Sequence, residues 1–183
     1  IDSCGKIKYM FPKAHAAAYV ISAFRIAWFK VHMPALYYAT YFSSRITDYD
    51  IEVMIKGYDA IKAKMAEIAA KGYEATNKES AVLETLKIAL EATARGIKFV
   101  PISLDESKAT VWGVKSDTEI VPPFASIDGL GDTVANNIAN EREKRGFLSI
   151  EEVQHRAKIS GTLMDKMRLM GIFDGMSESN QMS

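Results

Sequence analysis

The 183-residue sequence predicts a mostly α-helical protein: a helical first part, a small β patch, and a second helical unit built on glycine hairpins. Three observations lead to this fold class. Apolar residues recur at spacings of three and four through most of residues 1–96, as they do along one face of a helix. After Gly96, short runs rich in β-branched residues replace that pattern. From residue 127 onward, short helical patterns return, punctuated by glycines that include Gly129 and Gly131.

These changes divide the chain into four predicted parts. Residues 1–96 form the helical first part, 97–126 a short β connector, 127–176 the hairpin unit, and 177–183 a C-terminal tail. The hydrophobic content of 48% is enough to bury a core. Because the chain starts at Ile1 and shows no signal-peptide pattern, we expect it to be an internal piece of a longer protein.

Two helices are predicted at the start of the first part. Residues 14–32 follow Pro12, a residue well suited to a helix start, and Pro34 ends the segment. Apolar residues occupy nearly all sides of this segment, so we expect it to be buried on several faces or to contact a ligand. Residues 35–44 form a second, short helix with an aromatic run.

Two further helices complete the first part. Thr47 or Asp48 can cap a third helix, along which an apolar stripe runs from Ile51 to Ile68 before Gly72 stops it. The fourth helix begins at Thr76, which forms a capping-box pattern with a glutamate three residues on, and it ends at Gly96.

The β connector contains three short strand-like runs. They span residues 97–102, 110–114 and 119–121, and two consecutive prolines close the segment. We expect a small antiparallel patch.

The hairpin unit carries the most informative local pattern. Two glycines flank Leu130, and a helical pattern follows, which matches a helix-hairpin-helix motif. Glycines permit a turn that brings bare backbone against a phosphate, and the N–H groups at the next helix start attract an anion. Such a hairpin grips the DNA backbone without reading bases. We therefore predict duplex-DNA contacts at Gly129, Gly131 and Thr133; the alternative is a plain turn between packed helices.

The sequence downstream supports a tandem arrangement. Ser149 is a predicted helix cap with Glu152 as its capping-box partner. Residues 158–164 then resemble a second, degenerate hairpin.

Composition limits the function classes. Lys and Arg together number 23, as do Asp and Glu, and this balance argues against a polycation that binds nucleic acid by charge alone. The balance hides an asymmetry, because residues 1–47 hold six basic residues and one acidic residue. This asymmetry is compatible with one part of the chain facing an anion, although charge alone slightly favours a solvated surface with no ligand.

Cellular setting is predicted from two further features. The single cysteine, Cys4, excludes an internal disulfide framework and favours a reducing compartment. No apolar run of about 18 residues occurs, so we expect a cytoplasmic protein with no membrane partner.

The residues alone reveal no catalytic apparatus. The acidic residues Asp48 and Asp50 are explained by helix capping, and the three histidines lie far apart, so no metal site is predicted. Lys13 and His15 stand near a helix start ahead of three alanines, where a phosphate could approach. Tight packing against another helix explains the alanines as well.

A long block of the sequence closely resembles a known family. Residues 1–4, 6–19 and 25–27 are similar to the fingers of PolC-type replicative DNA polymerases, the DNA polymerase III alpha subunits of Gram-positive bacteria and their relatives. The likeness continues through residues 29–32, 37–39, 54–57, 70–75, 120–124, 129–131 and 146–149, and so covers effectively the whole chain.

The resemblance implies different roles for the two parts of the chain. Residues 1–96 would belong to the fingers, which bind the incoming dNTP and the primer-template end, and later residues would hold the duplex. The implied nucleotide- and DNA-binding residues of the fingers are Lys6, Lys8, Lys13, His15 and Arg25. The palm, whose aspartates hold catalytic Mg²⁺ in the family, has no counterpart here. The chain alone should therefore lack nucleotidyltransferase activity and bind no cofactor. The palm and thumb would be its partners.

The sequence departs from the family pattern at two places. Asp128 replaces the usual proline before the first hairpin glycine, and an anion there opposes phosphate binding. The family's tail docks on the sliding clamp, whereas this chain ends in Gln181, Met182 and Ser183 without the two apolar anchors. Two other readings stay open: a free-standing helix-hairpin-helix module without enzymatic activity, and a purely structural helical adaptor.

Overall fold

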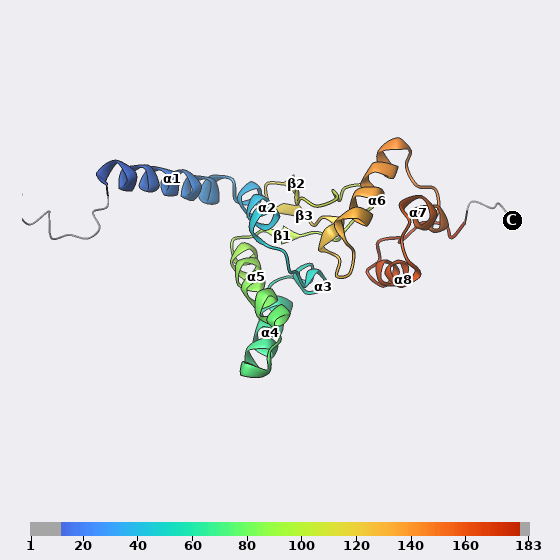
Figure 1. Ribbon diagram of the computed structural model, residues 1–183, viewed down its shortest axis with the longest axis horizontal. Helices are drawn as coiled ribbons and strands as arrows, with labels where there is room; N and C mark the ends of the chain where they lie inside the picture. Colours follow the sequence, from blue (N-terminus) through green and yellow to red (C-terminus); the bar gives the residue numbers. More distant parts are fainter. Residues whose placement is uncertain (1–11, 180–183) are drawn as a thin grey trace, which may run out of the picture.

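The computed structural model describes residues 12–179 and confirms a mostly helical chain with a small sheet. Figure 1 shows helix α1 (Lys13–His32) extending to one side, the pair α4 (Tyr58–Ala70) and α5 (Asn77–Ala94) extending to another, and the last helices at the end opposite α1. The remaining elements of the first part are α2 (Pro34–Arg45), α3 (Ile51–Met54) and the 3₁₀ turn η2 (Gly72–Glu74).

The predicted boundaries of the first two helices are confirmed. Pro12 precedes α1, and Pro34 is the first residue of α2, with Met33 as the only residue between the two helices. The predicted burial of α1 is not found among residues 12–179. None of its residues is buried, and Phe24 is 72% exposed. An ion pair of 2.6 Å from Lys30 to Glu91 ties the end of α1 to α5.

The prediction of one long third helix is wrong. The helix breaks at Gly57, whose φ of +87° lies in the left-handed region that favours glycine, so α3 and α4 are separate. The cap also differs from the prediction, because the Asp50 side chain accepts a hydrogen bond from the Val53 N–H at 3.3 Å. The apolar stripe is nevertheless buried, at Ile51 and Met54 in α3 and at Ile61 and Ile68 in α4.

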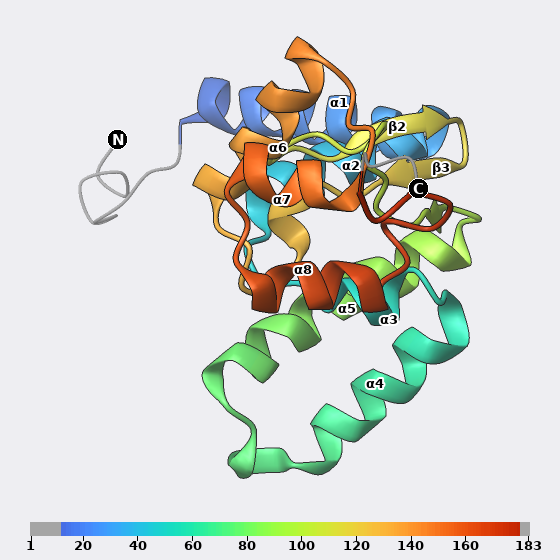
Figure 2. The same ribbon diagram turned by 90° about the vertical axis from the view of Figure 1, so that its right-hand side faces the viewer.

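The fourth predicted helix is confirmed as α5. The Thr76 side chain accepts from the Glu79 N–H, and the Glu79 carboxylate accepts from the Thr76 N–H at 2.9 Å, which is a complete capping box. Helix α5 folds back along α4, and the pair forms the long arm visible in Figure 2.

The β connector is a mixed sheet and not the predicted antiparallel patch. Its strands β1 (Lys98–Phe99), β2 (Gly113–Ser116) and β3 (Glu119–Val121) lie in the order β1-β3-β2. A two-residue turn joins β2 to β3, so these strands pair antiparallel. The long segment from residue 100 to 112 crosses the sheet instead, and it allows β1 to pair parallel with β3.

The last part consists of the 3₁₀ turn η3 (Phe124–Ser126) and the helices α6 (Asp132–Lys144), α7 (Ile150–Ala157) and α8 (Gly161–Leu169). The hydrophobic core runs without interruption from α2 through the sheet to these helices. The predicted four-part division therefore describes changes in sequence pattern, while one core spans residues 35–173.

An aromatic cluster joins the first half of the chain to the sheet. Phe42 of α2 stacks on Trp112 with ring centroids 5.0 Å apart, and Phe99 of β1 lies 5.6 Å from Phe42. The Trp112 backbone N–H donates to the Ser43 hydroxyl at 2.9 Å. The Tyr49 hydroxyl lies 2.7 Å from the Phe42 carbonyl, which closes the cluster on its other side.

Truncation of this cluster should be costly. We expect Phe42→Ala to lower the free energy of unfolding by about 3–5 kcal/mol, because it removes buried area and leaves a cavity. The matched control is Phe24→Ala on exposed α1, which should change this free energy by no more than about 0.5 kcal/mol. Urea unfolding followed by circular dichroism measures both. Equal losses for the two variants would contradict the cluster's role.

Candidate nucleic-acid interface

The first hairpin is held on a rigid base. Arg142 of α6 donates from Nη1 to the carbonyls of Leu104 and Ser107, each at 2.7 Å. Its guanidinium also lies 5.9 Å from the centre of the Phe124 ring in η3. These contacts fix α6 and η3 to the loop between β1 and β2, and residues 127–131 connect η3 to α6.

The hairpin itself presents bare backbone to the outside. Ile127 and Leu130 are buried, and the Leu130 N–H donates to the Ile127 carbonyl at 3.0 Å, which closes the turn. Gly129 takes a φ of +86°, which a residue with a side chain adopts only under strain. Gly131 is the N-cap of α6 and has an ordinary φ of −75°, with nothing within 4 Å of where a Cβ would stand.

The start of α6 has the features of an anion-binding site. No side chain caps it, since the N-cap residue is glycine. The first N–H groups of a helix have no intrahelical partners and carry the positive end of the helix dipole. The structure brings together the three predicted duplex-binding residues Gly129, Gly131 and Thr133, and all three are exposed. Their contact with DNA remains a prediction.

The second hairpin follows α7. Lys158 ends α7 in the left-handed region with a φ of +56°, Ile159 is buried, and Ser160 is the N-cap of α8. The Asn137 side chain of α6 lies 3.4 Å from the Ala157 carbonyl, at the start of this turn. Two hairpins therefore share one packed unit, in the tandem arrangement that the sequence predicts.

A charged cluster locks α7 onto α6. The Arg156 guanidinium lies 3.0 Å from the Glu152 carboxylate and 3.2 Å from that of Glu141, and it donates to the Arg145 carbonyl at 2.8 Å. Arg156 thereby satisfies carbonyl groups that the end of α6 leaves free. Ser149 caps α7, as predicted, by accepting from the Glu152 N–H at 3.2 Å.

The predicted capping-box contact of Glu152 takes a different form. Its carboxylate accepts at 2.8 Å from the N–H of Leu148, one residue before the predicted partner, Ser149. This hydrogen bond, followed by those from Arg145 and Arg156, lowers the pKa of Glu152 to about 2. Glu152 is thus an ionised, nearly buried residue at the centre of the helix pair.

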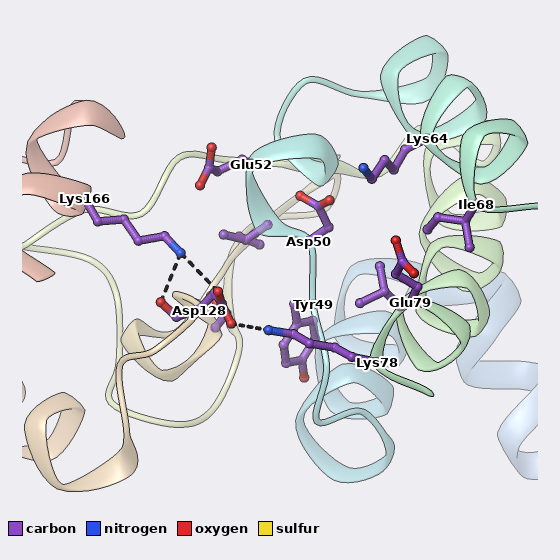
Figure 3. Close-up of a pocket in the computed structure, with 12 residues that line it drawn as sticks. Tyr49, Asp50, Glu52, Lys64, Ile68, Lys78, Glu79, Asp128 and Lys166 are labelled. Carbon is purple, nitrogen blue, oxygen red and sulfur yellow. Dashed lines mark hydrogen bonds and ion pairs between the residues drawn. The ribbon is translucent and has the colours of Figure 1, made fainter. Parts of the chain in front are cut away.

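Asp128, which the sequence marks as unfavourable for phosphate binding, is paired with two lysines. Its carboxylate lies 2.5 Å from the Lys78 ammonium of α5 and 3.4 Å from the Lys166 ammonium of α8. Figure 3 shows the lysines approaching Asp128 from opposite sides. The hydrogen bond from Lys78, with Lys166 nearby, lowers the pKa of Asp128, so the carboxylate stays charged but compensated.

Sequence reasoning missed Lys78 and Lys166. Lys78 lies within a capping box, and Lys166 lies on a short amphipathic helix, so each has an ordinary explanation. Their contacts with Asp128 span 50 and 38 residues of sequence, and no local pattern signals a pairing at that range.

The predicted fingers residues lie elsewhere. Lys13, His15 and Arg25 are exposed on α1, and the His15 ring stacks edge-on against Tyr19 with centroids 4.5 Å apart. Figure 1 places α1 at the end of the molecule opposite α7 and α8, so the structure does not bring these residues to the hairpins. Lys6 and Lys8, and the tail residues Gln181, Met182 and Ser183, lie outside the described residues.

Two kinds of feature are absent from residues 12–179. No three His, Cys, Asp or Glu side chains are grouped so that they could hold a metal ion. None of the described helices combines the length and apolar character needed to cross a membrane.

The pKa of Glu152 leads to a pH-dependent stability. Because folding lowers this pKa from an ordinary value of about 4.3 to about 2, the stabilisation is complete above about pH 5 and is lost as the pH falls toward 2. We expect Glu152→Gln to unfold more easily at pH 7 and to depend less on pH in that window, as measured by urea midpoints. Glu151→Gln, at the neighbouring exposed position, is the control. The same pH dependence in both variants would contradict the assignment.

Comparison with known proteins agrees with this geometry. Residues 96–182 match the family model described as the helix-hairpin-helix motif. Over all 183 residues the chain is 49% identical to the "DNA polymerase III PolC-type" proteins of Halalkalibacterium halodurans, Oceanobacillus iheyensis and Bacillus subtilis. The chain spans 13% of the length of each of these relatives. Such proteins match the chain along its whole length, and the hairpin motif lies in its second half. The chain therefore belongs to the family of PolC-type DNA polymerase III.

Proposed function

We propose that the chain is the part of a replicative DNA polymerase that holds primer-template duplex through its tandem hairpins during template-directed synthesis. The observation that carries the proposal is the exposed hairpin at residues 129–131, followed by an α6 start that no side chain caps. Backbone N–H groups in this arrangement bind phosphate oxygens of either strand without reading sequence. A replicative enzyme needs that kind of grip, because it must move over every sequence.

We also propose that residues 1–96 contribute to the fingers. The exposed cations Lys13 and Arg25, with His15, lie on one helix that projects from the core, which leaves them accessible to a nucleotide or a primer-template end. Lys6 and Lys8 belong to the same proposed set of nucleotide- and DNA-binding residues. Large apolar side chains on α1 are exposed as well, including Phe24 and Val31 at 72% and 64%. Such a surface supports packing against the remaining polymerase domains.

The parent protein would be a cytoplasmic nucleotidyltransferase whose palm binds Mg²⁺ and performs the chemistry. In our proposal the chain alone supplies binding surfaces and no catalytic metal site. The tail at Gln181, Met182 and Ser183 would belong to the clamp-binding end of the protein. These assignments follow from the family and from the projecting, uncovered surface of α1.

The hairpin assignment is tested by adding a side chain where the phosphate would lie. The valine side chain of Gly131→Val has room in the free protein, so this variant should fold normally. It should bind primed duplex about tenfold more weakly, because one hydrogen bond to a charged group is lost. Fluorescence anisotropy at several salt concentrations measures this, and affinity should fall as salt rises.

The control for this experiment is Gly146→Val. That glycine is also exposed with nothing near its Cβ position, but it lies outside the hairpin. It should bind like the unaltered chain. If Gly131→Val also binds like the unaltered chain, the hairpin is a plain turn, and the hypothesis of a purely structural helical adaptor is favoured.

The fingers assignment is tested in the full-length polymerase. We expect Lys13→Ala to raise the KM for dNTP about tenfold, because a cation at a helix start would contact the nucleotide phosphates. Steady-state incorporation measures KM and kcat, with Lys62→Ala on α4 as a control for loss of surface charge. An unchanged KM removes Lys13 from the nucleotide site.

A further inference from the structure

Three charged residues from distant parts of the sequence meet beside the first hairpin. Lys78 comes from the start of α5, Asp128 from the hairpin, and Lys166 from the middle of α8. The Lys166 ammonium also donates to the Asp128 backbone carbonyl at 3.0 Å. Two ammonium groups therefore surround one carboxylate, which gives the cluster a net charge of +1, while Asp132 in the first turn of α6 adds one negative charge beside Gly131.

This cluster borders the surface that would meet DNA. A hollow of about 350 Å³ beside the hairpin is lined by Lys78, Asp128 and residues 129–131, together with residues 47–49 and 125–127. Lys78, the carboxylates of Asp48 and Asp128, and the backbone that is suited to phosphate therefore face the same open space. A second hollow, of about 250 Å³, is lined by Lys78, Lys166 and Asp128 together with other charged residues.

Four other acidic residues line these hollows, Asp48, Asp50, Glu52 and Glu79, and three of them have local roles. Asp50 caps α3, Glu79 pairs with Lys71 within the capping box, and Asp48 accepts from the Thr47 hydroxyl at 2.9 Å. Of the described acidic residues, Asp128 is the one for which the structure gives an ion pair with Lys78 or Lys166.

The Lys78–Asp128 pair is easily opened. Both side chains are 59% exposed, and ion pairs with this exposure contribute little to stability because water and salt screen them. A phosphate oxygen can therefore replace the carboxylate at Lys78 with little loss. Lys166 is less exposed, at 30%, and its hydrogen bond to the Asp128 carbonyl keeps it in place when the carboxylate turns away.

We infer that Lys78 and Lys166 form a subsite for a DNA backbone phosphate next to the hairpin, and that the Asp128 carboxylate occupies it until duplex binds. The inference rests on the proposed duplex binding and deepens it. Asp128 then acts as an internal competitor that lowers affinity, and Lys78 extends the DNA contact from the hairpin unit to α5. In the free protein the Asp128 carboxylate takes the place of the phosphate.

The test measures binding of fluorescein-labelled primed duplex to the chain by anisotropy over a range of KCl concentrations. Asp128→Asn, which keeps the shape and removes the charge, should bind about three- to tenfold more tightly. Lys78→Met and Lys166→Met should each bind about five- to tenfold more weakly, and each should reduce the slope of log affinity against log salt by about one. In the Lys78→Met background, Asp128→Asn should gain less, because the two residues share one interaction.

The control is Lys87→Met, which removes an exposed lysine paired with Glu84 on the same helix and should bind like the unaltered chain. Melting temperatures confirm that each variant is folded. Weaker binding by folded Asp128→Asn would overturn the inference and would show that Asp128 supports the structure of the hairpin. Lysine variants that bind like Lys87→Met would overturn it too.

This failure is distinct from failure of the proposed function. If Gly131→Val loses affinity while both lysine variants keep it, duplex binding by the hairpin stands and the subsite is wrong. If the unaltered chain shows no salt-dependent binding of duplex, the proposed function fails, and the subsite fails with it.

Discussion

The fold depends on the packing of Trp112 and Phe99 against Phe42. This contact attaches the sheet to α2, and β3 leads directly into η3 and the helices that follow. Trp112 is bonded at both of its nitrogens, to the Ser43 hydroxyl through the backbone and to the Tyr49 hydroxyl through the indole at 3.4 Å. Because buried polar groups need partners, these bonds allow a tryptophan to fill the centre of the core. One continuous core then connects the parts that the sequence pattern distinguishes.

The core supports the hairpin through the loop between β1 and β2. Backbone hydrogen bonds join Phe124 to the Lys108 carbonyl and Ala125 to the Ala109 carbonyl, at 2.9 and 3.0 Å, and Arg142 holds the same loop from α6. Binding through backbone N–H groups requires this support, because a mobile turn would lose conformational entropy each time it met a phosphate. The neutral composition of the chain is compatible with such binding, since the donors are peptide groups and the nearby acid, Asp128, is paired.

Local patterns in the sequence were enough to predict much of the secondary structure. The capping box at Thr76, the glycine hairpin at residues 129–131 and the proline break between α1 and α2 were all predicted, because each depends on a few adjacent residues. The break at Gly57 was missed, since the apolar stripe continues in register across it and hides the change of direction. The mixed sheet was missed because strand order is set by long connections and not by the strands.

The hairpin could thus be predicted from the order of residues, because motifs of glycine, capping residues and apolar spacing act over one or two helical turns. The family was predicted from the resemblance of residues 1–19 and later blocks to PolC-type polymerases. The tertiary structure alone decided that α1 projects uncovered and that Lys78 and Lys166 reach Asp128 across 50 and 38 residues. Electrostatic contacts of that range depend on how whole helices pack, and no local pattern carries that information. Asp128, which the sequence pattern marks as unfavourable for phosphate binding, is in the structure one member of a paired cluster.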